Sequence, residues 1–166
     1  MTSWLPVAAV VMAAGCGAPA RPLPDRPTRP GAPSELLVRF ENEMGSYFRF
    51  GRLDLYVDGT LLFMRACADD DTDCPDQMRG RLLHFGVVAA GEHAANANLV
   101  YHSNPVGFGA FSYIRAYTFR LRSAHSFVVR RGHRLELSVI AHERGGVTTP
   151  IEERPAVRWV ERVLPL

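Results

Sequence analysis

The sequence predicts an all-β fold: an antiparallel β-sandwich of about seven to eight strands that follows a Pro-rich tether. Three observations predict it. Apolar and polar residues alternate at period two across much of 35–166, which is typical of sheets with one buried and one hydrated face. Turn residues, glycine among them, separate the alternating stretches at short intervals, as in sandwiches. Proline is concentrated before residue 35, so we expect the folded domain to occupy 35–166.

The chain begins with an uncharged, mostly apolar run over 4–14, which small residues separate from Cys16. Such a run is typical of a secretory signal, because a membrane span needs about 20 apolar residues. With a cysteine in this position, residues 1–16 resemble a bacterial lipoprotein signal, in which the thiol is acylated. We therefore expect a signal peptide that ends at an acylated Cys16. The alternatives are an ordinary cleaved signal and a cytoplasmic protein.

The residue after the cysteine bears on the location of the protein. It is Gly17, where some bacteria use Asp to retain a lipoprotein at the inner membrane. We therefore expect an outer membrane lipoprotein of the cell envelope, facing the periplasm or the cell surface.

Residues 17–34 contain six of the twelve prolines of the chain. Proline fixes φ and removes a backbone donor, so neither a helix nor a central strand is expected here. Extended polyproline II at about 3.1 Å per residue would let this linker hold a domain up to roughly 50 Å from a lipid surface.

The first strands are predicted at 36–40 and 53–57, where apolar residues alternate with polar ones. The Asp58-Gly59 pair that follows predicts a tight hairpin turn into an apolar stretch at 61–64.

The second half of the chain contains two ambiguous segments. The Ala-rich stretch 89–97 is expected to lead into a strand. Residues 155–164 have both strand and helix spacing, and we favour a strand over a short helix. The remaining strands are expected at 98–102, 113–122, 127–129 and 135–141.

Two short motifs carry a family resemblance. Residues 53–59 read Leu-Asp-Leu-Tyr-Val-Asp-Gly, and 91–93 read Gly-Glu-His before a further apolar stretch. This pattern is similar to the bacterial PEGA-type β-sandwich, in which a Val-Asp-Gly turn precedes a Gly-x-His start of the next strand. The similarity covers 52–142, with Ala90 where the family has proline. It implies an extracytoplasmic, non-catalytic module associated with the surface or the wall, and it carries over no catalytic residues.

The chain contains 19 arginines and no lysine, and its formal net charge is +2. This excess is too small to indicate a nucleic-acid partner, for which basic residues would have to cluster on one face. It permits weak attraction to anionic lipid or cell-wall polymer. The expected partners are therefore a membrane, through the lipid anchor, and a protein or a cell-wall polymer.

Cys67 and Cys74 are the cysteines beyond Cys16. In an oxidising compartment we expect them to form a disulfide, which the loop-entropy model values at roughly 2.5 kcal/mol. The alternatives are two free thiols or half of a metal site completed by distant histidines.

An acidic stretch lies between these cysteines. Asp69, Asp71 and Asp73 mimic the start of an EF-hand calcium loop. Cys74 stands at the sixth position, where glycine is needed, and Gly80 at the twelfth, where a bidentate Glu belongs. We expect a solvated acidic loop and no cofactor. Calcium-dependent binding through 69–76 is the alternative.

The sequence contains no motif that predicts an enzyme. The six histidines form no local ligand pair, and Ser112 lies in Gly-Ala-Phe-Ser-Tyr rather than in a Gly-x-Ser-x-Gly elbow. A metal- or Ser-dependent periplasmic hydrolase remains the alternative.

The Gly-rich stretch 104–111 with its neighbour Tyr113 is the best candidate for a binding loop, because recognition sites concentrate on loops at the ends of a sandwich. Its candidate contact residues are Phe108, Phe111 and Tyr113. In the alternative, Phe108 and Phe111 fold back onto the core. The sequence thus predicts an envelope-tethered, non-catalytic binding or structural module.

Overall fold

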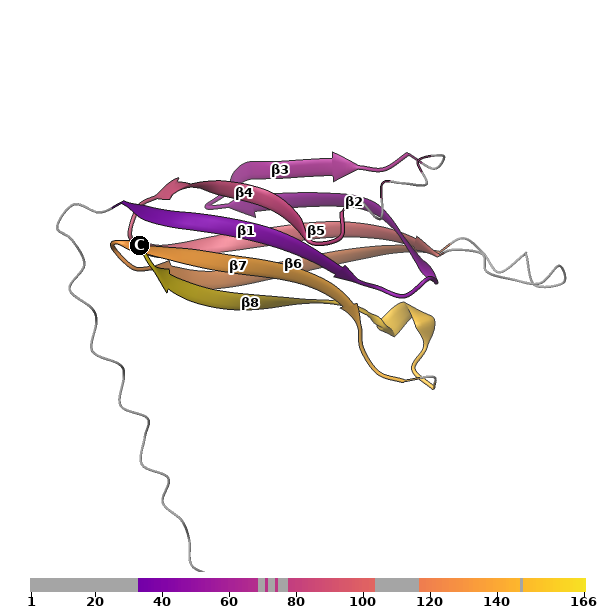
Figure 1. The fold of residues 1–166 in the computed structure, drawn as a ribbon. Helices are drawn as coiled ribbons and strands as arrows, with labels where there is room; N and C mark the ends of the chain where they lie inside the picture. The colour runs from indigo at the N-terminus through magenta and orange to yellow at the C-terminus, as the bar shows by residue number, and fades with distance from the viewer. Residues whose placement is uncertain (1–32, 69–70, 72–73, 75–77, 104–116, 147) are drawn as a thin grey trace, which may run out of the picture.

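The described residues form eight β-strands in two four-stranded sheets that pack face to face (Figure 1). The structure is a computed structural model and describes residues 33–68, 71, 74, 78–103, 117–146 and 148–166. The strands are β1 (Ser34–Glu43), β2 (Phe48–Val57), β3 (Thr60–Ala66), β4 (Arg81–Val88), β5 (Gly91–Ser103), β6 (Thr118–Val129), β7 (His133–Glu143) and β8 (Pro155–Pro165). The first sheet has the order β4-β1-β7-β8 and the second β3-β2-β5-β6, which confirms the predicted sandwich.

The strands pair antiparallel, except that β1 and β7 are parallel neighbours in the centre of the first sheet. The prediction of an antiparallel sandwich did not include this parallel pair. Both strands of this pair bury one face against the second sheet. Alternation predicts which face of a strand is buried, but it does not predict which strand lies beside it.

The two ends of the sandwich differ in their connections. β1 starts at one end, which we call the proximal end, and the short turns 58–59, 89–90 and 130–132 lie there as well (Figure 1). The opposite, distal end receives the connections 44–47, 67–80, 104–117 and 144–154. The longer connections therefore lie at the end opposite to the start of β1.

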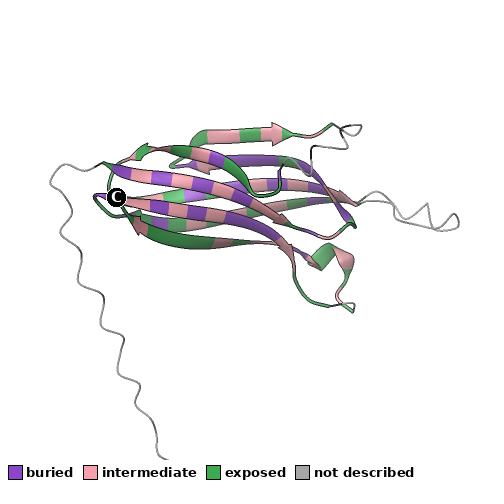
Figure 2. Ribbon diagram, viewed as in Figure 1, coloured by how far each residue is buried: buried purple, intermediate pink, exposed green. Residues whose placement is uncertain are grey.

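The core fills the space between the sheets, and buried positions alternate with less buried ones along the central strands (Figure 2). In β1, for example, Leu36, Val38 and Phe40 are fully buried. Towards the distal end the core becomes aromatic: the Phe50 ring centroid lies 5.8 Å from that of Phe40 and 5.7 Å from that of Tyr101. Such tilted and edge-to-face contacts add about 0.5–1.5 kcal/mol each beyond the burial of area.

The predicted strand boundaries were wrong in several places. β5 begins at Gly91, so most of the Ala-rich stretch 89–97 is itself a strand rather than a lead-in. Its alanines at 95 and 97 are fully buried and alternate with more exposed residues, as expected for a strand with one face towards the core. The stretches 113–122 and 127–129 were predicted as separate strands, whereas β6 is continuous over its described length. β4 was not predicted.

The domain boundary also differs by one residue. Ser34 was assigned to the linker, but it is buried and pairs with Val88 as the first residue of β1. The remaining linker up to residue 32 lies outside the described residues, as does the signal segment with Cys16. The ambiguous segment 155–164 is a strand, as favoured, and not a helix.

A hydrogen bond ties the two sheets together inside the distal part of the core. The hydroxyl of Tyr101 in β5 donates to Asn42 Oδ1 in β1 over 2.9 Å. Tyr101 is fully buried, and desolvation raises the pKa of its hydroxyl far above the ordinary value. The hydroxyl is therefore a neutral hydrogen-bond donor at neutral pH.

On one open side of the sandwich, β6 faces β8. The rings of His125 and Trp159 stack with centroids 5.5 Å apart, and His125 Nε2 lies 2.7 Å from a Glu161 carboxylate oxygen. Trp159 Nε1 donates to Ser123 Oγ over 2.8 Å. These contacts cover the core on the side where the edge strands β6 and β8 lie opposite each other.

The described part of the chain has no helix with the length and hydropathy that crossing a membrane requires.

Removal of the Tyr101 hydroxyl by Tyr101→Phe should lower the free energy of unfolding by about 1–2 kcal/mol, because Asn42 loses a buried donor. Urea unfolding measures this change. Tyr56→Phe is the matched control: the hydroxyl of Tyr56 has no hydrogen bond within the described residues, and we expect a change within about 0.5 kcal/mol. Equal effects of the two variants would contradict the assigned role of Tyr101.

Candidate functional site

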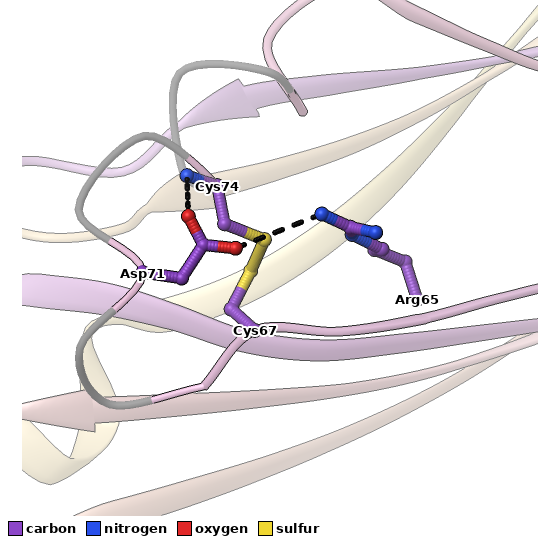
Figure 3. Close-up of a disulfide and its surroundings, with 4 residues drawn as sticks. All are labelled: Arg65, Cys67, Asp71 and Cys74. Atoms are coloured by element: carbon purple, nitrogen blue, oxygen red, sulfur yellow. Dashed lines mark hydrogen bonds and ion pairs between the residues drawn. A yellow bond between two sulfur atoms is a disulfide. The ribbon is translucent and has the colours of Figure 1, made fainter.

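Cys67 and Cys74 form a disulfide, as predicted, with Cα atoms 5.8 Å apart (Figure 3). Cys67 follows β3, and its N–H donates to the carbonyl of Gly51 in β2 over 2.8 Å. Cys74 is fully buried. The disulfide therefore fixes the connection between β3 and β4 to the distal end of the sandwich.

The carboxylate of Asp71 is engaged within this connection. One oxygen accepts the Cys74 N–H over 3.0 Å, and the other lies 3.7 Å from an Arg65 guanidinium nitrogen (Figure 3). The other two residues of the calcium prediction, Asp69 and Asp73, lie outside the described residues. Within the described part of the chain, no group of three or more His, Cys, Asp or Glu side chains could hold a metal. The calcium hypothesis stays a prediction.

The predicted binding loop also lies outside the described residues, together with Phe108, Phe111 and Tyr113. Its flanks are described at the distal end. Ser103 N–H donates to the Tyr117 carbonyl, and Tyr117 N–H donates to Ser103 Oγ, both over 2.8 Å. The connection between β5 and β6 thus starts from a closed pair of hydrogen bonds.

The proximal end contains a contact that the sequence reasoning did not identify, and which we call the Asp58–His93 clasp. Asp58 Oδ2 accepts a hydrogen bond from His93 Nδ1 over 2.6 Å, and Oδ1 accepts the N–H of Ala94 over 2.9 Å. Asp58 has a φ of 50° and Gly59 a φ of 77°, as expected for the predicted Asp-Gly hairpin turn. The two motifs of the PEGA resemblance, 53–59 and 91–93, therefore meet in this clasp.

Both ring nitrogens of His93 are engaged. Nδ1 faces the Asp58 carboxylate, and Nε2 lies 2.9 Å from the carbonyl oxygen of Ala89. A carboxylate and a carbonyl only accept, so both contacts are hydrogen bonds when His93 is a doubly protonated imidazolium. The hydrogen bond to Asp58 raises the pKa of His93, and the same bond lowers the pKa of Asp58.

A depression of about 440 Å³ lies beside the clasp, and Ser126 contributes to its wall. The co-occurrence of Ser126, His93 and Asp58 has the residue types of a hydrolytic triad. However, a general base needs a free nitrogen that faces the serine, and both nitrogens of His93 already face acceptors. In this geometry Asp58 and His93 form a structural clasp, and neither ring nitrogen of His93 is directed at Ser126 as a base.

What we call the arginine surface consists of Arg52, Arg120 and Arg122 on the second sheet, together with Arg144 at the adjoining edge of the first. Arg120 and Arg122 project from the edge strand β6, and neither makes a hydrogen bond or ion pair within the described residues. Arg144, which follows β7, donates from Nε to the Glu153 backbone carbonyl over 2.7 Å and has no carboxylate partner among the described residues. Only Arg52 is balanced, through a 2.8 Å pair with Asp54.

Two depressions meet at residues 120–122. One of about 200 Å³ lies between Arg52 and Arg122, over β2, β5 and β6. The other, of about 330 Å³, lies between β6 and the start of β8 and reaches Arg144. Both depressions are therefore bordered by the same unpaired guanidinium groups.

On the outer face of the first sheet, three arginines pair with glutamates, whereas Arg162 has no ion pair within the described residues. The closest atoms are 2.9 Å apart in the Arg39–Glu136 and Arg158–Glu43 pairs and 2.6 Å in the Arg134–Glu35 pair. The period-two alternation of 118–122 places Arg120 and Arg122 on one face, but nothing in the sequence indicates that they lack acidic neighbours. That property depends on strands distant in sequence.

Loss of the disulfide in a Cys67→Ala, Cys74→Ala variant should lower the free energy of unfolding by about 2.5 kcal/mol, because the unfolded chain gains loop entropy. Urea unfolding with and without a reductant measures this difference. The reductant should lower the stability of the wild type to that of the variant and leave the variant unchanged. Two alkylatable thiols in the wild-type protein purified without reductant would contradict the disulfide.

The clasp should make stability depend on pH. Its full contribution requires an ionised Asp58 and a protonated His93. It is therefore greatest between about pH 4 and 6.5, the ordinary pKa values of the two groups. It declines as the pH rises through the raised pKa of His93, and as it falls through the lowered pKa of Asp58. We expect the free energy of unfolding of His93→Gln to be about 1 kcal/mol lower than that of the wild type at pH 5.5. The difference should be smaller at pH 9.

Chemical unfolding at both pH values tests this dependence. His133→Gln is the matched control, because His133 lies near another proximal turn and its Nδ1 contacts the Arg131 backbone carbonyl, with no carboxylate partner among the described residues. If His93→Gln lowered the free energy of unfolding equally at pH 5.5 and pH 9, the ion pair would not contribute to stability.

Comparison with family models, with curated proteins and with solved structures finds no match for the chain.

Proposed function

We propose that the protein is a non-catalytic binding module of the bacterial cell envelope, anchored at the outer membrane through an acylated Cys16. The observation that carries the proposal is the polarity of the sandwich. β1 starts at the proximal end, whereas the longer connections lie at the distal end (Figure 1). An anchor that precedes Ser34 would direct the distal end away from the membrane.

The segment before β1 supports the same arrangement. The prolines of 17–34 favour an extended spacer of up to roughly 50 Å, so the sandwich would stand clear of the lipid surface. The flanks of the sheets would then be accessible as well as its distal end. A partner in the envelope, a protein or a cell-wall polymer, would approach these surfaces.

The most developed polar arrangements in the described residues favour binding over catalysis. The acid–histidine pair has no free ring nitrogen. The arginine surface offers unpaired cations beside two shallow depressions and no nucleophile–base pair. Unpaired guanidinium groups are suited to hold an anionic partner in place. The calcium-dependent module and the periplasmic hydrolase stay predictions, with no observation that favours either of them.

Replacement of the acylated residue tests the anchor. Cys16→Ser should move the protein from the membrane fraction to the soluble fraction, because the lipid cannot be attached. The Cys67→Ala, Cys74→Ala variant is the matched control: it removes two thiols but keeps Cys16, and it should stay with the membrane. Both distributions are measured by fractionation and immunoblotting. Unchanged partition of Cys16→Ser into detergent would overturn the proposed anchor.

A further inference from the structure

We propose that the arginine surface binds an acidic polysaccharide, a glycan chain whose carboxylate or phosphate groups pair with Arg120 and Arg122. The inference deepens the proposed function, on which it rests, by giving the binding module a class of ligand. It follows from the charge, the spacing and the polar neighbours of these two arginines.

The positive charge of the arginine surface favours an anionic ligand. Arg120 and Arg122 are exposed and have no acidic partner within the described residues, and Arg144 adds a third uncompensated cation at the same edge. The carboxylate of Asp54 is already bound by Arg52. Guanidinium groups bind carboxylate and phosphate in a bidentate manner, which fixes the orientation of the ligand as well as its charge.

The spacing calls for an extended ligand with repeated charges. Arg120 and Arg122 are two residues apart on one strand, which places their Cα atoms about 6.5–7 Å apart on the same face. Val100 of β5 pairs with Arg52 on one side and with Arg120 on the other. Arg52 and Arg120 therefore lie in one row, two strands or about 10 Å apart. A single small anion cannot reach all of these groups, whereas a polymer that lies across the sheet can.

The neighbours of the arginines favour a glycan over a protein. Asn98 lines the depression between Arg52 and Arg122, and Asn96 lies two residues before it on the same face of β5. Neither amide is hydrogen-bonded within the described residues, so both can donate to and accept from sugar hydroxyls. A protein interface would instead be expected to include exposed aromatic or large apolar anchors. The exposed side chains that line the depression itself are arginines, while the apolar Met64 lies exposed next to Arg52 at its β3 side.

The test uses the full chain with Cys16→Ser, so that no lipid anchor contributes. The probes are polygalacturonate, which carries a carboxylate on each sugar, and phosphorylated dextran, with neutral dextran as the control polymer. We expect affinity electrophoresis to show retardation by at least one acidic polymer, weakened by added salt. Neutral dextran should have no effect.

The decisive comparison uses two variants with the same change in net charge. Arg120→Gln, Arg122→Gln should weaken binding at least tenfold. Arg158→Gln, Arg162→Gln alters β8 in the first sheet and should change the affinity less than twofold. Thermal unfolding checks that both variants are folded. Arg120→Lys, Arg122→Lys keeps the charge but loses the bidentate geometry, and it should bind with intermediate affinity.

Three results would overturn the inference: no retardation by either acidic polymer, equal losses in the two Gln variants, or binding that depends on Arg120 and Arg122 for phosphatidylglycerol vesicles or DNA but not for the polymers. None of these results bears on the membrane fractionation of Cys16→Ser. A failure of the polysaccharide ligand is therefore distinguishable from a failure of the envelope anchor.

Discussion

The two sheets are held together by apolar side chains that each central strand presents on a single face. Leu36 and Val38 from the first sheet are fully buried in the same core as Leu53 and Leu55 from the second. Full burial of such a side chain contributes about 1.5–3 kcal/mol, and neither sheet has another surface against which to bury them. Because the opposite faces stay hydrated, the pairing of the strands is confined to one register.

The two ends of this core are stabilised in different ways. The proximal end has turns of two or three residues and is fastened by the Asp58–His93 clasp. This clasp joins the β2–β3 hairpin turn to the start of β5, which follows the connection from the first sheet, through a charge-assisted hydrogen bond. The distal end has the longer connections, and the disulfide fixes one of them next to the aromatic part of the core. The clasp therefore fastens the turns 58–59 and 89–90 at the end at which β1 starts.

The arginines of this chain have different roles on the two sheets. On the first sheet, Arg39, Arg134 and Arg158 pair with glutamates of other strands, so the charge of these three is balanced. On the second sheet, Arg120 and Arg122 extend from an edge strand next to neutral neighbours in β5. The net charge of +2 is small, but the charged side chains are unevenly distributed over the two sheets. A surface of this kind attracts anions locally, although the molecule as a whole is close to neutral.

The sequence by itself determined the all-β class, the hairpin at Asp58-Gly59 and the pairing of Cys67 with Cys74, because period-two alternation, turn chemistry and a short loop are local properties. Only the tertiary structure decided which strands are neighbours: the parallel β1–β7 pair, the unpredicted β4, and the continuation of β5 through the alanines. It also decided both candidate sites. His93 meets Asp58 across 35 positions, and Arg120 joins the row of Arg52 through a strand that lies between them. Alternation fixes the face on which a side chain lies, but contact across a sheet depends on strand order and register, which the packing of the whole core selects.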